Sequence, residues 1–261
     1  MLSPALPRMR RVQVLARLPH LGRGFTQGLI ADGVGFVWES TGQYGQSVLR
    51  RYRLGARQDE EAAAVPPEFF AEGICRVGAC IWQLTWQERV ALRWRTAPLT
   101  LLETVPYDRE GWGICAAGDW IVTSDGSSEL VRRDPRTLQP LEIVVVRCGG
   151  ERIMGLNDLA WSGGLVWANV IGRRYLAGID PASGEVVEIV DARSAAERHW
   201  RNPEAVMNGI AALPGAGEFL LTGKNWRHVY HVRLTPARPR HDPACLLTGW
   251  PSGRDAAGRA G

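Results

Sequence analysis

The chain has 261 residues, enough for one large domain with a sizeable core, and 45% of them are hydrophobic. No run of 18 apolar residues is present, so the sequence predicts no membrane span, and the N-terminal stretch lacks the apolar segment of a signal peptide. The formal net charge of +4 comes from arginine-rich ends without interleaved aromatic residues, which argues against nucleic-acid binding. As written, the sequence predicts a cytoplasmic protein; a preceding export signal would make it periplasmic or secreted.

The strand signals recur along the chain. Short apolar runs bounded by glycine, aspartate or proline indicate strands. They start at Gly35 (GFVWES), Gly78 (GACIWQLTW), Gly118 (GDWIVTSDG), Gly164 (GLVWANV) and Gly217 (GEFLLTGKNW). Each run follows a short Gly- or Asn-containing stretch and precedes a second apolar stretch. This period of 40 to 53 residues predicts an all-β fold, a five-bladed β-propeller, with a two-sheet sandwich as the alternative.

The repeat also divides the chain. Residues 1–24 form a basic N-terminal segment that contains the first or closing strand, and residues 25–234 form the propeller. Residues 235–261, rich in Pro, Arg and Gly, are predicted to be a disordered tail. The five cysteines show no CxxC spacing, so we expect buried free thiols, with a disulfide between Cys75 and Cys80 as the alternative.

Propeller geometry predicts that polar residues of different blades meet in one place. The innermost strand of each blade lines a central channel, and the short stretches before each run are the candidates for these strands. They would bring together Gln27, Glu72, Glu110, Trp112, Asn157, Asp158 and Asn208. The ends of the next strands would add Glu39, Trp86, Asp125, Asn169 and Lys224, of which Asn169 is a candidate for substrate binding. Trp38, Trp82 and Trp167 alternate out of phase and are expected in the core.

Lys224 is the only lysine of the chain, against 30 arginines. It follows a predicted strand, in the stretch TGKNW. A tight pocket lined by carboxylates and amides suits a compact ammonium group better than a planar guanidinium. We therefore assign Lys224 to the channel, with a chance occurrence on a surface strand as the alternative.

These stretches resemble the glutamine cyclotransferase family, the plant and bacterial type of glutaminyl-peptide cyclotransferase. The resemblance runs from Phe25 to Leu234 and rests on eleven motifs in order: FTQGL, ESTGQYGQS, FAEGI, LTW, YDREGWG, SDGSSEL, LNDL, WANV, IDPASGEV, MNGIA and TGKNW. It implies a five-bladed propeller that converts N-terminal glutaminyl residues to pyroglutamate with release of ammonia.

The resemblance also implies roles for single residues. Glu72 in FAEGI would be the general acid and base. The other matching positions would line the pocket, with Gln27, Asn157 and Lys224 close to the reaction and Phe25, Trp86 and Trp112 around the substrate. Two positions depart from the family pattern. Ile171 stands where another pocket tryptophan is usual. The usual run Asn-Glu-Leu-Glu is Asn-Asp-Leu-Ala at residues 157–160, so that one acid is shortened to Asp158 and one is replaced by Ala160.

The implied reaction fits the residue types. The α-amine of the substrate attacks its own γ-carboxamide carbon, so the enzyme needs no nucleophile of its own. One buried carboxyl, assigned to Glu72, can take the proton from the amine and pass it to the departing ammonia. Asn157, Gln27 and Lys224 are the candidates for stabilising the oxyanion. Whether Lys224 contacts the substrate or orients Glu72 stays open at this point.

No cofactor and no catalytic metal are required by this chemistry. Three oxygens from Glu39, Asp125 and Asn169 could hold a structural divalent cation in the channel. The expected partner is a peptide or free amino acid with an N-terminal glutamine, without nucleic acid or membrane, and the protein is expected to be a monomer. Two other functions compete: a non-catalytic module that binds peptides or proteins, and a metal-dependent propeller lactonase or esterase.

Overall fold

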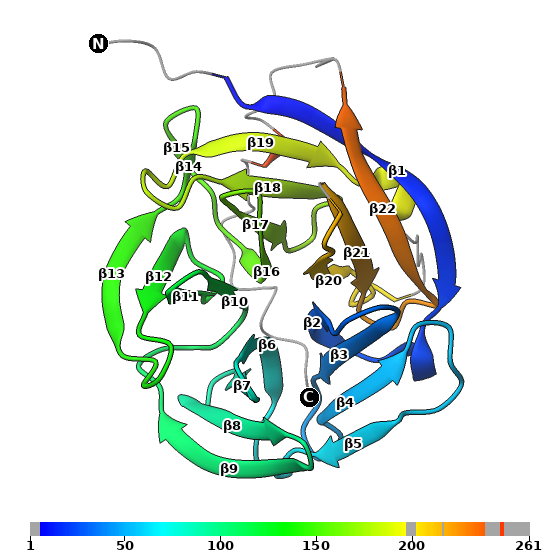
Figure 1. Cartoon of the computed structure of the whole chain (residues 1–261). Helices are drawn as coiled ribbons and strands as arrows, with labels where there is room; N and C mark the ends of the chain where they lie inside the picture. The colour runs from blue at the N-terminus through cyan, green and yellow to red at the C-terminus, as the bar shows by residue number, and fades with distance from the viewer. Residues whose placement is uncertain (1–5, 197–201, 216, 238–245, 248–261) are drawn as a thin grey trace.

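The structure is a computed structural model that describes residues 6–196, 202–215, 217–237 and 246–247 (Figure 1). These residues form 22 strands and two single-turn 3-10 helices, η1 (Leu21–Arg23) and η2 (Arg193–Ala195). The predicted all-β class is confirmed. In the described part of the chain, no helix has the length and apolar character needed to cross a membrane.

Three four-stranded antiparallel sheets take their strands in chain order. The first contains β2 (Thr26–Ala31), β3 (Phe36–Thr41), β4 (Val48–Arg53) and β5 (Glu61–Ala64). The second contains β6 (Ala71–Val77), β7 (Cys80–Thr85), β8 (Val90–Thr96) and β9 (Leu99–Pro106). The third contains β10 (Ile114–Ala117), β11 (Trp120–Ser124), β12 (Glu129–Arg133) and β13 (Pro140–Val145), and a short ribbon of β14 (Arg147–Cys148) and β15 (Glu151–Arg152) follows it.

The remaining strands form one eight-stranded sheet in the order β16-β17-β18-β19-β1-β22-β21-β20. Their bounds are β16 (Leu156–Ser162), β17 (Leu165–Val170), β18 (Tyr175–Ile179), β19 (Val186–Asp191), β1 (Arg8–Pro19), β22 (His228–Pro236), β21 (Glu218–Gly223) and β20 (Met207–Ala212). The sheet changes direction where β1 and β19 pair in parallel. It therefore consists of two antiparallel groups of four strands, and the N-terminal β1 completes the second group beside β22.

The two ends of the chain meet in this last group. Thr235 and Pro236, which the sequence assigned to the tail, belong to β22 and pair with β1. Most of the predicted disordered tail lies outside the described residues. Leu247 is described and packs in the core with 2% of its surface exposed.

The sheets surround a common centre, which the inner strands β2, β6, β10, β16 and β20 face (Figure 1). The core lies between neighbouring sheets. Trp38 of the first sheet packs with Ile74 of the second, and Trp82 of the second packs with Ile121 of the third. Trp38, Trp82 and Trp167 are 1%, 2% and 5% exposed, so their predicted place in the core is confirmed.

Tight turns explain the glycines that begin the predicted runs. Gly78, Gly118 and Gly164 have positive φ angles of 61°, 69° and 80°, at the hairpins that follow three of the inner strands. Two-residue hairpins need this left-handed backbone, which glycine adopts without strain. Cys75 and Cys80 are free thiols, so the alternative of a disulfide between them is wrong.

Candidate active site

Four inner strands carry a β-bulge at a predicted site residue. The pairing register shifts after Thr26 in β2, after Ala71 in β6, after Leu156 in β16 and after Met207 in β20. A bulge interrupts the regular alternation of side chains and re-aims one of them. The residues within these shifts include Gln27, Glu72, Asn157 and Asn208, and each has 5% or less of its surface exposed.

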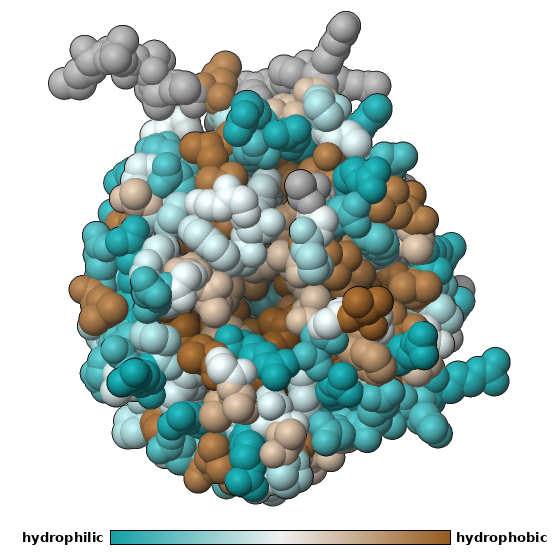
Figure 2. All heavy atoms as spheres, in the orientation of Figure 1, coloured by the Kyte–Doolittle hydropathy of each residue, from teal (hydrophilic) through white to brown (hydrophobic). Residues whose placement is uncertain are grey.

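Hydrogen bonds join three of these residues across three strands. Asn208 Nδ2 donates to Gln27 Oε1 at 2.9 Å, and Gln27 Nε2 donates to Glu72 Oε1 at 2.9 Å. The donor direction fixes the orientation of the Gln27 amide. Gln27 therefore holds the Glu72 carboxyl in place, as the sequence placed them together. The face seen in Figure 1 is hollowed at its centre, over these inner strands (Figure 2).

Glycines let the inner strands approach one another closely. A Cβ atom added at Gly73 would lie 2.6 Å from the carbonyl oxygen of Trp112, and one at Gly113 would lie 2.0 Å from that of Asn157. Gly28 is packed in the same way against β6. Real Cβ atoms do not come this close to backbone, so these positions require glycine. These close contacts fix the backbone next to Glu72 and Asn157.

Glu72 has an unusual electrostatic environment. Burial raises the pKa of its carboxyl well above the usual range. The positive charge of Lys224 opposes this shift, whereas the negative charges of Asp158, Glu88 and Glu110 add to it. The carboxyl can therefore carry a proton at a pH where an ordinary glutamate is ionised.

Lys224 lies in the turn that follows β21 and is half-buried. Its Nζ atom stands over the ring of Phe25, 4.7 Å from the ring centroid, a favourable cation–π contact. It makes no direct ion pair with a described carboxylate. Burial lowers the pKa of Lys224, and the charges of Glu72 and Glu204 partly oppose that shift. The lone lysine is thus placed beside Phe25 and within the electrostatic reach of Glu72.

The residues after Lys224 explain its fixed position. Asn225 has a φ of 59°, a left-handed conformation that asparagine tolerates, and its N–H donates to the carbonyl of Gly24. The Trp226 ring packs against Gly223, and its Nε1 donates to the carbonyl of Ala205. The Asn-Trp pair therefore anchors the turn on both sides.

A buried ionic network supports the turn that carries Lys224. His20 Nδ1 lies 3.0 Å from the Trp226 carbonyl and its Nε2 lies 2.8 Å from Glu39 Oε1. Both partners are acceptors, so both ring nitrogens donate and His20 is an imidazolium. Arg50 and Thr26 donate to the same carboxylate. Burial would raise the pKa of Glu39, but these positive charges and hydrogen bonds lower it to about 2.

Aromatic side chains form a wall beside Glu72. Phe70 is central: its ring lies edge-to-face with Phe25, Tyr44 and Trp86, at centroid distances of 6.1, 5.4 and 5.6 Å. Gly42 leaves room for this ring, because a Cβ there would lie 2.3 Å from it. Phe25 and Trp86 were predicted to line the site. Phe70 and Tyr44 were not, although both occur in motifs that carry the family resemblance, FAEGI and ESTGQYGQS.

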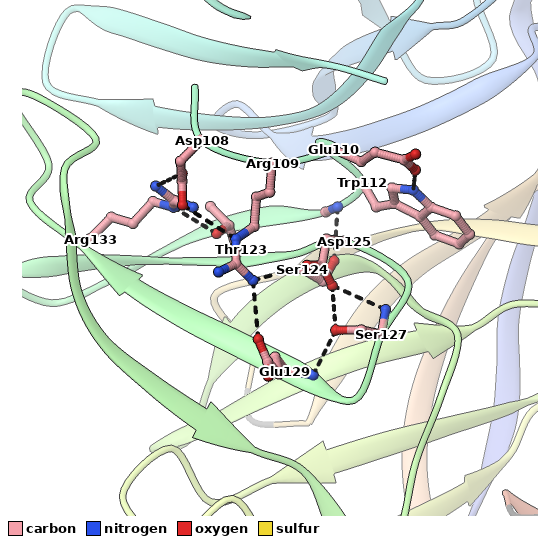
Figure 3. Close-up of polar contacts among 11 residues, drawn as sticks. Asp108, Arg109, Glu110, Trp112, Thr123, Ser124, Asp125, Ser127, Glu129 and Arg133 are labelled. Atoms are coloured by element: carbon pink, nitrogen blue, oxygen red, sulfur yellow. Dashed lines mark hydrogen bonds and ion pairs between the residues drawn. The ribbon is translucent and has the colours of Figure 1, made fainter. Parts of the chain in front are cut away.

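Trp112 borders the site on another side, next to the loop that leads to β16. Its ring packs on Gly126, and its Nε1 donates to Glu110 Oε2 at 3.3 Å (Figure 3). The neighbouring Arg109 binds Asp125 at 2.9 Å and contacts the carboxylate of Glu129 at 3.3 Å. This ionic network attaches the segment before Trp112 to the loop after β11.

Several buried amides lack protein partners. Asn157 Oδ1 and Asn208 Oδ1 make no hydrogen bond with the described residues, and neither side-chain atom of Asn169 does. Asn169 is fully buried on β17, which pairs with β16 beside the Asn157 bulge. Buried polar groups are nearly always hydrogen-bonded in proteins, so these amides are available to a ligand or to water.

The three oxygen donors considered for a cation are in different situations. The carboxylate of Glu39 is occupied by His20, Thr26 and Arg50, and that of Asp125 by Arg109 and Ser127. Asn169 alone has free side-chain atoms. Among the described residues, no group of three His, Cys, Asp or Glu side chains could hold a metal ion.

The residues at the departures from the family pattern make no hydrogen bond with Glu72, although the charge of Asp158 adds to its raised pKa. Asp158 is buried and its Oδ2 accepts the N–H of Ile210 at 2.8 Å, so the shortened acid links β16 to β20. Ala160 packs in an apolar core cluster with Trp167. Ile171 follows β17 and is half-buried.

Comparisons with known proteins identify the family of this chain. The family model described as glutamine cyclotransferase matches residues 3–234. The chain belongs to the glutamine cyclotransferase family. It is 30% identical over 235 residues to an Arabidopsis thaliana glutaminyl-peptide cyclotransferase, covering 88% of this chain and 73% of the relative. The crystal structure of Myxococcus xanthus glutaminyl cyclase superposes with a TM-score of 0.82 and 34% identity, covering 89% of this chain and all of that one. As a member of this family, the protein is an enzyme of the acyltransferase class.

Proposed function

We propose that this enzyme converts N-terminal glutaminyl residues of peptides, or free glutamine, to pyroglutamate and releases ammonia. The observation that carries the proposal is the buried Glu72 carboxyl, hydrogen-bonded to Gln27 and within the field of the single lysine. A protonatable group in this position suits a reaction in which one proton leaves an amine and another joins a departing amide nitrogen.

Glu72 acts as the proton carrier in this mechanism. As the α-amine attacks the γ-carboxamide carbon, the Glu72 carboxylate takes a proton from the amine nitrogen. It then gives that proton to the amide nitrogen, the C–N bond breaks and ammonia leaves. The raised pKa matters here, because a carboxyl with a pKa closer to neutrality can both accept and return a proton.

The other polar residues stabilise and orient the reacting groups. The Gln27 amide donates to Glu72 and accepts from Asn208, so its role is to position Glu72. Asn157 Oδ1 has no partner among the described residues and can accept a hydrogen bond from an N–H of the substrate, whereas the Nδ2 group of the same amide is the candidate donor to the developing oxyanion. Lys224 supplies a positive charge beside this centre and, through its contact with Phe25, fixes the edge of the aromatic wall.

The aromatic wall binds the apolar part of the glutaminyl side chain and excludes water. Phe25, Phe70 and Trp86 form its continuous part, and Trp112 lies beside the strand that carries Asn157. Holding the α-amine against the γ-carbon requires a folded substrate conformation, which rigid aromatic surfaces can enforce. Asn169, buried with two free amide atoms, is a further candidate for substrate contact.

The fold supports this site as a five-bladed propeller. We propose that the three four-stranded sheets and the two halves of the eight-stranded sheet are its five blades, with residues 8–19 as the closing strand. Every group used in the mechanism comes from one chain, which is consistent with a monomer. The chemistry needs no cofactor, since the substrate carries its own nucleophile.

The test is turnover of a glutaminyl dipeptide amide. Ammonia release and the loss of one ammonia mass from the peptide should both be observed. The Glu72→Gln variant should lose activity by on the order of a thousandfold, because the proposed mechanism passes the proton through the Glu72 carboxyl and an amide cannot carry it. Activity that vanishes with a chelator instead would support a metal-dependent hydrolase, and no turnover by the parent enzyme would support a binding module.

The stability of the same variant gives an independent check. A folded-state pKa above the unfolded value means that the folded protein loses stability as pH rises from the unfolded pKa to the folded one. Glutamine removes this penalty and can still accept the bond from Gln27. At neutral pH, Glu72→Gln should therefore melt at the same or a higher temperature than the parent. A large fall in melting temperature would assign Glu72 a structural role instead.

A further inference from the structure

Tyr44 and Glu88 form a hydrogen-bonded pair that the cyclisation chemistry does not use. Tyr44 Oη donates to Glu88 Oε1 at 2.6 Å. Tyr44 lies in the loop between β3 and β4, and Glu88 lies in the loop between β7 and β8. The pair therefore bridges the first and second sheets, at the ends from which Glu39 and Trp86 also come.

The pair lies at the outer edge of the aromatic wall. The Tyr44 ring contacts Phe70, which in turn contacts Trp86 and Phe25. Tyr44 itself is 46% exposed, so its outer side faces solvent. Glu88 is near enough to Glu72 for its charge to add to the raised pKa of that carboxyl. The pair thus stands between the reacting centre and bulk water.

Among the residues that the structure describes, Glu88 has no counter-charge. Its Oε2 atom is buried and makes no hydrogen bond, and its other oxygen is bound by Tyr44 rather than by an arginine, lysine or histidine. Glu39 and Asp125 differ from Glu88 in this respect, because Glu39 pairs with His20 and Arg50, and Asp125 pairs with Arg109. An unpaired buried carboxylate oxygen is costly, so this position is complementary to a cation that arrives from outside.

The reaction determines what part of a substrate reaches this pair. The α-amine and γ-carboxamide of the glutamine must lie together at Glu72, which directs the carbonyl end of the glutamine and the following residue outward. We propose that Tyr44 and Glu88 form a subsite for the second residue of a glutaminyl peptide and that they favour arginine or lysine there. The ring supplies a cation–π surface and Glu88 supplies the opposite charge. This inference rests on the proposed function.

The first experiment uses the unmodified enzyme with three dipeptide amides, Gln-Arg, Gln-Ala and Gln-Glu. The ratio of kcat/KM for Gln-Arg to that for Gln-Glu should be about tenfold, since one side chain is attracted and the other repelled at a partly buried site. The ratio should shrink when salt is raised from about 50 mM to about 500 mM, because screening weakens exposed charge interactions.

Two variants assign the preference to Glu88. Glu88→Gln should remove most of the preference while Gln-Ala is still turned over, and Glu88→Lys should invert it in favour of Gln-Glu. Glu103→Gln is the matched control: it makes the same change in net charge on the outer strand β9, where Glu103 pairs with Arg93. That control should keep the parent preference, and melting temperatures should show that all variants are folded.

The outcomes separate this inference from the proposed function. Equal kcat/KM for the three peptides in the parent enzyme, or an unchanged preference in both Glu88 variants, overturns the subsite while cyclisation stands. A failure to release ammonia from any of the three peptides overturns both.

Discussion

The single lysine of the chain is placed where a compact cation has a specific use. Its ammonium group stands over the Phe25 ring, and its backbone N–H donates to the carbonyl of Val206. The charge acts on Glu72 without a direct ion pair, so Glu72 keeps its raised pKa and stays able to exchange a proton. At this position, the positive charge of Lys224 limits how far burial raises the pKa of Glu72.

Lys224→Arg should separate charge from shape. Arginine keeps the charge, but its larger planar group must either stack on Phe25 at a different depth or reach Glu72 and form a direct pair. A direct pair would lower the pKa of Glu72 and impair proton transfer. We expect kcat to fall by on the order of a hundredfold, with little change in melting temperature. Equal kcat in the two proteins would show that the ammonium has no catalytic use.

At the scale of elements, hydrogen bonds join segment 20–24 to the turn 224–227. His20 N–H donates to the carbonyl of Arg227, Asn225 N–H donates to that of Gly24, and the His20 ring binds the Trp226 carbonyl. Phe25 and Lys224 are adjacent in space because these segments are joined. The buried charges of His20 and Glu39 stabilise the joint.

This joint predicts a dependence of stability on pH. The Glu39 pKa is lowered from 4.5 to about 2, so its contribution is present above pH 4.5 and is lost as pH falls toward 2. The His20 pKa is raised from 6.5, because Glu39 and the Trp226 carbonyl outweigh the opposing effect of burial; its contribution is complete below pH 6.5 and is lost as pH rises through the raised value. The joint should contribute most between pH 4.5 and 6.5.

Denaturant unfolding across this range tests the prediction. Acidification from pH 4.5 to 2 should remove about 3 kcal/mol of unfolding free energy through Glu39, and Glu39→Gln should flatten that slope. Glu218→Gln is the control, since Glu218 also pairs with a histidine and an arginine but lies nearer the surface. An acid slope that survives unchanged in Glu39→Gln would contradict the assignment.

The close approach of β6 to the segment that begins the next sheet gives a second test at this scale. Gly73→Ala places a Cβ atom 2.6 Å from the Trp112 carbonyl oxygen, so the strands must separate. We expect a loss of about 1–3 kcal/mol in unfolding free energy and a fall in kcat, because Glu72 is the adjacent residue. Gly118→Asn, in an open hairpin turn, should cost far less. Normal kcat in Gly73→Ala would show that the site tolerates this separation.

The whole molecule depends on closure of the ring. β1 pairs with β22 from Arg10 to Pro19 and with β19 at Arg8–Arg11, so the N-terminal strand joins the last two groups of strands. Inner strands of different sheets supply the site, and none of them could bury its polar residues alone. Activity and cooperative unfolding should therefore be lost together when the ring is opened.

Removal of residues 1–19 tests this dependence. The shortened protein should unfold over a broader denaturant range, with a smaller m value, and should not turn over a glutaminyl peptide. A deletion of residues 1–5 alone leaves every described strand intact and is the control. Full activity in the longer deletion would mean that the site does not need the closing strand.

Local patterns in the sequence determined the strand repeat, the turn glycines, the tryptophans of the core and the identity of Glu72, Gln27 and Lys224 as residues that meet. They are readable because hairpin turns and strand alternation act over a few residues. Only the tertiary structure decided how those residues interact: the bulges that aim them, the central place of Phe70, the unpaired Glu88 and the contact of Lys224 with Phe25. These features depend on contacts such as that between His20 and Trp226, 206 residues apart. The charge and burial that a side chain experiences are set by such distant neighbours, which its own segment does not encode.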